Sequence, residues 1–230
     1  MPDNWDFSQK PSRPRRTVDT GPQMPLMTYL MVALSTIITV AYLQPGLVNS
    51  PAWINLGHFG FTAAWPWPMI TTIFIHGTWL HLLFNMIWLI QLGRILENTL
   101  HPLAYLGLVV GAAAVGSGCQ LLIPPHQTGI GMSGVVYAMF GLMWAGRSAF
   151  ASWASVATPD NLRLFVLWGL FCVVGTLFHF LNVANGAHGG GFLFGLCIGF
   201  LFFTMRRHWV WAVPLVLLVG ATVVSAVLLA

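Results

Sequence analysis

Residues 131–141 read Gly-Met-Ser-Gly-Val-Val-Tyr-Ala-Met-Phe-Gly, which places the Ser133 hydroxyl between two glycines at the start of an apolar helix. A serine hydroxyl does not attack a carbonyl carbon unaided. It needs a general base within hydrogen-bond reach and donors for the oxyanion that forms. Gly134, Ala138 and Gly141 also have the spacing of small residues that lets a second helix approach closely, and 191–199 carries three glycines at the same spacing. The stretch therefore predicts either a reactive serine in a helix at the bundle centre or a helix whose glycines serve packing alone.

The composition is that of an integral membrane protein. Of the 230 residues, 57% are hydrophobic and 6% are charged, and the mean hydropathy is +0.78. Soluble proteins have about a quarter of their residues charged. The net charge of +4 comes from scattered basic residues, so nucleic acid is not an expected partner. Three cysteines inside apolar runs, Cys119, Cys172 and Cys197, are interpreted as packing residues rather than a disulfide, a metal site or a nucleophile.

Apolar runs predict an all-α, polytopic membrane bundle. Several runs are short for a hydrocarbon core about 30 Å thick, and the one that begins at Met132 suits a helix surrounded by other helices. The predicted helices are 24–43, 79–96, 102–123, 132–147, 162–180, 187–205 and 209–230. Residues 1–23 are polar and rich in proline, which predicts a disordered tail. Residues 44–77 are rich in tryptophan and proline, which predicts a segment in the bilayer interface.

The basic residues predict the orientation of the bundle. With the amino terminus in the cytoplasm, the positive-inside rule is satisfied, because every basic residue then falls on the inner side. They are Lys10, Arg13, Arg15, Arg16, Arg94, Arg147, Arg163, Arg206 and Arg207. The second, fourth and sixth helices then enter from the outer face, so their first turns lie at similar depth. In this orientation Ser133 is expected to open to the outer, periplasmic or extracellular, side.

The polar residues of those first turns are candidate partners for Ser133. His81 and Asn85 are four residues apart and share a helix face, His76 precedes that helix, and His188 begins the sixth. No Asp or Glu falls within the predicted helices, and Lys10 is the only lysine. This excludes a Ser-His-Asp triad and a Ser-Lys dyad in the membrane, so a Ser133–His188 dyad is expected. Exposed backbone N–H groups at a helix start favour a developing oxyanion.

These motifs resemble those of the rhomboid intramembrane serine proteases. Gly131-Met132-Ser133-Gly134 resembles the G-x-S-G nucleophile site of that family, and the stretch 187–191, Ala-His-Gly-Gly-Gly, resembles its A-H-x-x-G site of the general base. His76, His81 and Asn85 match its H-x4-H-x3-N pattern. The resemblance implies that His81 and Asn85, with Ser133, form the oxyanion hole. It also implies that His76, Tyr137, Gly131 and Gly134 support the site, with Tyr137 stacked on His188.

The resemblance also implies an activity and a domain organisation. The activity is cofactor-independent hydrolysis, through an acyl-enzyme on Ser133, of peptide bonds in or near membrane-spanning segments. Partners would be single-span or other transmembrane substrates and the lipid bilayer. Residues 24–205 would form a six-helix core, after the tail 1–23 and before an additional transmembrane helix in 206–230. Activity is expected to fall at acid pH, because His188 must be neutral to act as a base.

Other functions are possible on the same sequence. A rhomboid-like protein without activity could bind membrane clients, although such proteins usually lack the serine or the histidine. A transporter or channel would be expected to carry an intramembrane acid or a helix broken in mid-membrane. His76, His81 and His188 could hold zinc, but His76 and His81 fall on different helix faces and Ser133 would have no role, so no metal is expected.

Overall fold

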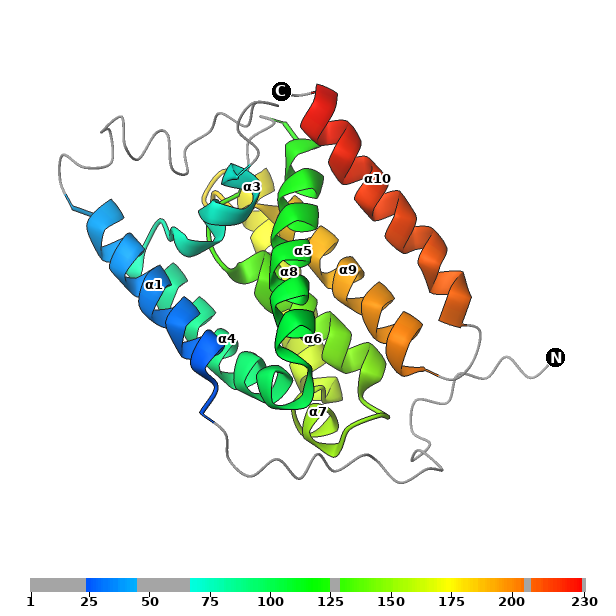
Figure 1. Cartoon of the computed structure of the whole chain (residues 1–230). Coiled ribbons are helices and arrows are strands. Elements are labelled where there is room, and N and C mark those ends of the chain that lie inside the picture. Colours follow the sequence, from blue (N-terminus) through cyan, green and yellow to red (C-terminus); the bar gives the residue numbers. More distant parts are fainter. Residues whose placement is uncertain (1–23, 45–66, 125–128, 205–207, 229–230) are drawn as a thin grey trace.

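The chain is all-helical in the parts that the structure describes. The computed structural model describes residues 24–44, 67–124, 129–204 and 208–228 (Figure 1). Its elements are α1 (Leu26–Tyr42), α3 (Pro68–Thr71), the 3₁₀ turn η1 (Thr72–Phe74), α4 (Trp79–Thr99), α5 (Pro102–Leu121), α6 (Ser133–Gly146), α7 (Ala151–Val156), α8 (Pro159–Leu177), α9 (Asn185–Phe203), the 3₁₀ turn η2 (His208–Trp211) and α10 (Ala212–Leu228). This confirms the predicted all-α class, whereas the tail 1–23 and most of the predicted interfacial segment lie outside the described residues.

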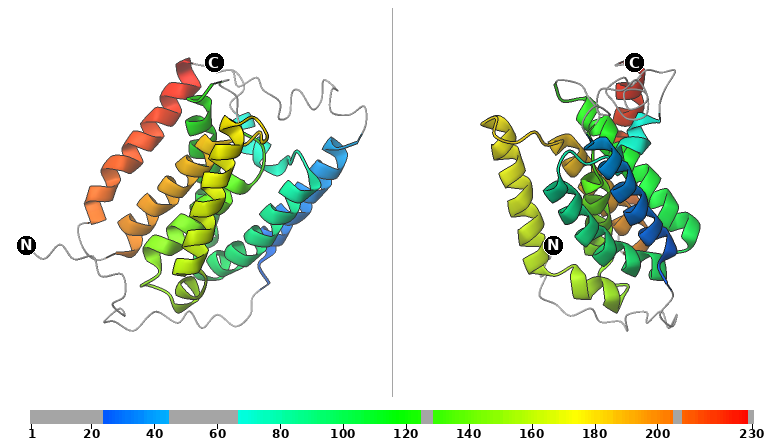
Figure 2. Two further views of the ribbon diagram at one scale, coloured as in Figure 1. Left: turned by 180° about the vertical axis from the view of Figure 1, so that it is seen from behind. Right: turned by 90° about the vertical axis from the view of Figure 1, so that its left-hand side faces the viewer.

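Helix length separates two groups of apolar helices. Four helices, α4, α5, α8 and α9, have 19 to 21 residues and are long and apolar enough to cross a membrane. The apolar helices α1, α6 and α10 are shorter. All of them run in roughly the same tilted direction through the molecule (Figure 2). The structure is therefore that of a membrane helical bundle.

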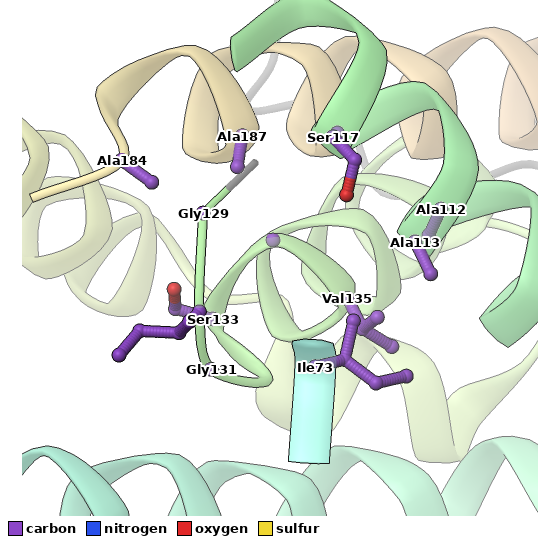
Figure 3. A pocket seen from close by; sticks show the side chains of 13 residues that line it. Ile73, Ala112, Ala113, Ser117, Gly129, Gly131, Ser133, Val135, Ala184 and Ala187 are labelled. Atoms are coloured by element: carbon purple, nitrogen blue, oxygen red, sulfur yellow. The ribbon is translucent and has the colours of Figure 1, made fainter. Parts of the chain in front are cut away.

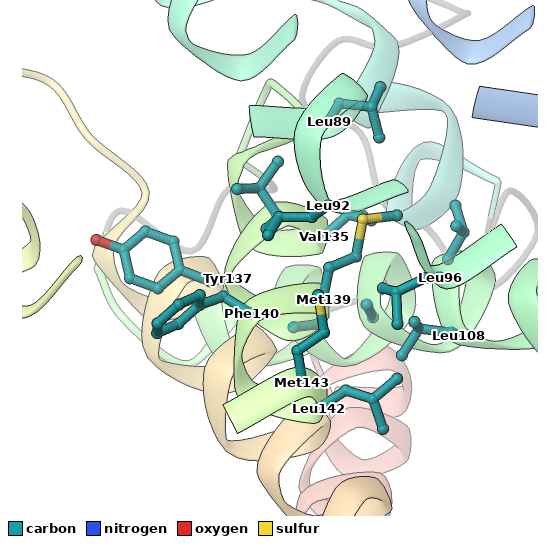
Figure 4. Packing of buried hydrophobic residues seen from close by; sticks show 14 of the residues in the cluster. Leu89, Leu92, Leu96, Leu108, Val135, Tyr137, Met139, Phe140, Leu142 and Met143 are labelled. Carbon is teal, nitrogen blue, oxygen red and sulfur yellow. The ribbon is translucent and has the colours of Figure 1, made fainter. Parts of the chain in front are cut away.

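The shortest of these, α6, lies at the centre of the bundle. Every residue from Gly134 to Met143 is buried. Leu89 and Leu92 of α4 belong to the same buried cluster as its Val135 and Met139 (Figure 4). Because α6 is enclosed by protein, its 14 residues do not have to match the thickness of the lipid.

Glycines let α9 approach α6 at backbone distance, as their spacing predicts. A Cβ atom added at Gly191 would collide with the carbonyl oxygen of Gly134, and one at Gly195 would collide with that of Ala138. Gly141 lies in the same way against the Phe192 carbonyl of α9, 2.5 Å from where its Cβ would stand. The contact between α6 and α9 therefore has no room for a larger side chain at these positions.

Two helices, α8 and α10, lie at the periphery of the bundle (Figure 2). In α8, the buried residues are Phe165, Cys172 and Gly175, and Figure 2 shows this helix standing at the outside of the bundle. On the other side, α10 packs its Thr222 onto Gly118 of α5. The C-terminal helix is thus in contact with the bundle.

Some helix ends differ from those predicted from hydropathy. The fifth predicted helix, 162–180, is observed at Pro159–Leu177, because the Thr158 side chain caps the Asn161 N–H and Pro159 suits the first turn. The second, predicted at 79–96, continues to Thr99, so Glu97 lies inside the last turn of α4. The expectation that no acid falls within a membrane helix is therefore wrong at Glu97, and also at Asp160, which lies in the first turn of α8.

Glu97 fastens the start of α1 to the end of α4. Its Oε1 accepts the Met27 N–H at 2.8 Å, and its Oε2 accepts the Thr28 N–H at 2.8 Å and the Thr28 hydroxyl at 2.7 Å. The Thr28 hydroxyl also meets the Tyr105 hydroxyl of α5 at 2.9 Å. These N–H groups belong to the first turn of a helix, where they have no partner within the helix and attract negative charge. Glu97 therefore joins α4 to α1 directly, and the Thr28 hydroxyl extends the connection to α5.

We expect Glu97→Leu to lower the stability of the folded bundle by about 3 kcal/mol, because it leaves N–H groups unpaired and removes charged acceptors. Thermal unfolding in detergent measures the change. Asp160→Asn is the control, since the Asp160–Arg163 ion pair is exposed and such pairs contribute little. Equal unfolding midpoints for the two variants would contradict the assigned role of Glu97.

Candidate active site

The structure brings Ser133 and His188 into contact. Ser133 is the first residue of α6 and His188 lies in the first turn of α9. The Nε2 atom of His188 is 2.7 Å from the Ser133 Oγ atom. The imidazole is 8% exposed. The Ser133 hydroxyl and the His188 imidazole are thus within hydrogen-bond distance of each other in a mostly buried site.

Tyr137 holds the imidazole from the side. Its ring stacks on that of His188, with centroids 4.7 Å apart and planes inclined by 18°. The Tyr137 hydroxyl donates a hydrogen bond to the Phe165 carbonyl of α8 at 2.9 Å. The phenol ring is therefore fixed at both ends and limits how the imidazole can turn.

The first turn of α9 is positioned by small residues and by a side-chain cap. Gly134 lies against the Ala187 carbonyl oxygen, which would be 3.1 Å from an added Cβ. The Gln120 Oε1 atom of α5 accepts the Gly186 N–H at 2.8 Å, which pairs one of the free N–H groups at the helix start. Both contacts fix where the first turn of α9, and with it His188, lies along the bundle axis relative to Ser133.

His76 clamps the chain just before the serine. Its fully buried ring accepts the Met132 N–H at Nε2, at 3.2 Å, so Nδ1 carries the proton and faces the Thr39 hydroxyl of α1, also at 3.2 Å. The Thr39 hydroxyl donates to the Phe74 carbonyl at 3.3 Å and accepts the His76 N–H at 3.2 Å. Both ring nitrogens of His76 are thus occupied by hydrogen bonds.

His81 and Asn85 lie beside this loop. The His81 ring meets the His76 ring edge to face, with centroids 4.9 Å apart. Asn85 is 5% exposed, and its Nδ2 donates one hydrogen bond to the His81 carbonyl at 2.8 Å, so a second amide hydrogen remains for another acceptor. Across the described ranges, no three His, Cys, Asp or Glu side chains form a group that could hold a metal ion.

Gly131 has a backbone conformation that favours glycine. Its φ angle is +101°, and an added Cβ would collide with the His81 ring. Its N–H donates to the Thr72 carbonyl of η1 at 3.0 Å. A cavity of about 10 Å³, close to the space one water molecule needs, lies between this loop and Ser117 of α5 (Figure 3).

The expected residues differ in how directly they contact Ser133 and His188. Ser133, His188 and Tyr137 are in direct contact; Gly131, His76 and His81 adjoin the serine through the loop; Asn85 lies one turn further along α4. Sequence reasoning missed Thr39 and Gln120, which hold the loop and the first turn of α9. Both are polar residues inside apolar runs, which was the available signal.

The fold and the site together define a membrane helical bundle with a serine and a histidine on adjacent central helices. The Rhomboid domain family model matches residues 63–205. The chain belongs to the rhomboid family, and with its several apolar helices it is an integral membrane protein.

Curated relatives agree with that assignment. The chain is 30% identical over 178 residues to Rhomboid protease GlpG of Yersinia pestis (strain Pestoides F), covering 76% of this chain and 62% of that protein. It is 33% identical over 150 residues to Rhomboid protease GlpG of Yersinia enterocolitica serotype O:8 / biotype 1B, covering 60% of this chain and 51% of that protein. The chain thus spans between about half and three fifths of the length of these relatives.

We expect Gly131→Ala to destabilise the loop before Ser133, because a positive φ costs an L-residue about 1 kcal/mol or more and the methyl group would displace His81. Thermal unfolding in detergent is the measurement. Gly189→Ala is the matched control, since an added Cβ there meets nothing within 4 Å. An unfolding midpoint for Gly131→Ala no lower than that of the control would show that the loop accommodates a side chain.

Proposed function

We propose that the chain is an intramembrane serine endopeptidase that hydrolyses peptide bonds in or near transmembrane segments of other proteins. The observation that carries this proposal is the 2.7 Å contact between Ser133 Oγ and His188 Nε2, at the start of two membrane helices. The family and the relatives named as proteases support the reaction type. A client-binding protein without activity would have no need for this contact.

The proposed reaction runs through an acyl-enzyme. Ser133 Oγ attacks the carbonyl carbon of the scissile bond while its proton passes to His188 Nε2. The tetrahedral intermediate collapses, the C–N bond breaks, and His188 gives the proton to the leaving amine. A water molecule then attacks the ester carbonyl, with His188 again accepting a proton, and the carboxylic acid leaves as Ser133 recovers its hydrogen. The sum is one peptide bond hydrolysed for one water molecule consumed.

The oxyanion is proposed to be stabilised by neutral donors. The Ser133 N–H lies at the start of α6, where the backbone N–H groups are free and the helix dipole favours negative charge. Asn85 has an amide hydrogen to spare, and the His81 ring lies against Gly131, two residues before the serine. Such preorganised donors are often the largest single contribution to catalysis of acyl transfer.

The proposed membrane setting follows from which groups gather at each end of the bundle. Ser133, His81 and His188 lie at the starts of α6, α4 and α9. Arg94 and Glu97 lie near the opposite end of α4, and Arg147 follows the end of α6. Under the positive-inside rule this distribution favours an amino terminus in the cytoplasm and a site near the outer face, and the bacterial relatives favour an inner membrane. In this arrangement α10 is a seventh spanning helix added to a six-helix core.

We expect Ser133→Ala to reduce cleavage of a single-span reporter protein at least about 1,000-fold, because no other group supplies the nucleophile. Cleavage is measured on gels with both proteins in proteoliposomes. Ser35→Ala is the matched control: Ser35 is a buried helix serine whose hydroxyl has no partner among the described residues, so its loss is expected to leave cleavage intact. Undiminished cleavage by Ser133→Ala would disprove the dyad, and an inactive parent chain would favour the client-binding alternative.

A further inference from the structure

The second nitrogen of the His188 ring has no hydrogen-bond partner among the described residues. For Nε2 to accept the Ser133 hydroxyl proton, the neutral ring must carry its own proton at Nδ1. Nδ1 is buried, and nothing in the described part of the chain accepts from it. An unpaired buried donor is costly, and the cost grows when the ring gains its second proton. A group that accepts the Nδ1 hydrogen would therefore assist the base directly.

Asn185, one turn earlier on α9, presents a free acceptor. Its Nδ2 donates to the Thr176 Oγ1 atom of α8 at 2.9 Å. The Thr176 hydroxyl donates its own hydrogen to the Cys172 carbonyl at 2.9 Å, so towards Asn185 it can only accept. This pairing fixes which end of the carboxamide is nitrogen. The Oδ1 atom then points elsewhere, is buried, and has no partner among the described residues.

The two unpaired atoms are complementary and lie on one helix face. Asn185 and His188 are three residues apart in the first turn of α9, a spacing that brings Cβ atoms within about 5–6 Å. That separation suits a donor and an acceptor joined by one water molecule. The Tyr137 ring of α6 stacks on His188, His81 of α4 is close enough to interact with His188 electrostatically, and the Cys119 thiol of α5 lies against Gly190. None of these is a carboxylate.

We propose that Asn185 is the positioning residue of the base: its Oδ1 accepts a hydrogen bond from a water molecule that accepts the Nδ1–H of His188. This inference rests on the proposed proteolytic function. The neutral amide of Asn185 then has the role that a carboxylate has in soluble serine hydrolases. It keeps the proton of neutral His188 on Nδ1 and stabilises the imidazolium.

Asn185→Leu tests the proposal, because leucine has a similar size and no acceptor. We expect kcat for reporter cleavage to fall about 10- to 100-fold with little change in KM, the loss expected for one hydrogen bond to a charged group. Thr176→Val is the matched control, since it breaks the same bond between α8 and α9 but leaves Oδ1 in place. It is expected to lower thermal stability as much as Asn185→Leu does, and kcat less than about threefold.

Asn185→Asp supplies the readout that a purely structural role would not change. A carboxylate near Nδ1 favours the protonated ring, so the acid limb of the pH–rate profile is expected to move to higher pH, with kcat recovered at alkaline pH. Equal losses of kcat in Asn185→Leu and Thr176→Val, or an unmoved acid limb in Asn185→Asp, would overturn the proposal.

A measurement without substrate separates this proposal from the proposed function. In proteoliposomes with ¹⁵N-histidine, the His188 Nδ1 signal, identified by its loss in His188→Gln, is expected to shift in Asn185→Leu and stay in place in Thr176→Val. An unshifted signal in Asn185→Leu would disprove the link to Asn185. A parent chain that cleaves no reporter would count against proteolysis, while the shift would still decide the role of Asn185.

Discussion

The close contact between α6 and α9 is the constraint on which the rest of the site depends. Gly191 and Gly195 let the backbone of α9 touch the carbonyl oxygens of Gly134 and Ala138. A helix pair separated by ordinary side chains has its axes 8–10 Å apart. Without the glycines, Ser133 Oγ and His188 Nε2 would not reach the 2.7 Å separation observed, because each stands on its helix beside this contact. Backbone proximity, not the length of either side chain, sets the geometry of the pair.

Among the residues that the structure describes, no acid lies near His188, and this has a physical reason in a membrane helix. A carboxylate buried at this depth would be costly in a membrane helix unless it were paired. Neutral groups around the His188 ring are proposed to replace a carboxylate. Tyr137 limits the rotation of the ring, and Asn185, the proposed partner, keeps the ring proton on Nδ1. Glu97 lies at the other end of α4, where it caps α1. Its charge therefore joins two helices at a distance from Ser133 and His188.

The helical class and the contact between α6 and α9 could be predicted from the sequence because both depend on local spacing. Apolar runs set the helices, and the glycines of 131–141 and 189–199 set the contact. Hydropathy alone predicts the wrong start for α8, at residue 162, because the capping signal of Thr158 and Pro159 lies outside the apolar run. The pairing of Glu97 with α1 and of His76 with Thr39 depends on how helices far apart in the sequence align in depth. No periodicity encodes that alignment.

The central claim, that His188 activates the Ser133 hydroxyl, is tested most directly by labelling with a fluorophosphonate, which reacts with an activated serine. The purified chain in detergent is incubated with the probe and analysed by intact mass and peptide mapping. One adduct per chain, located on Ser133 and lost in His188→Ala, is the predicted result. Labelling at another residue, no labelling of the parent chain, or an equal labelling rate in His188→Ala would contradict it.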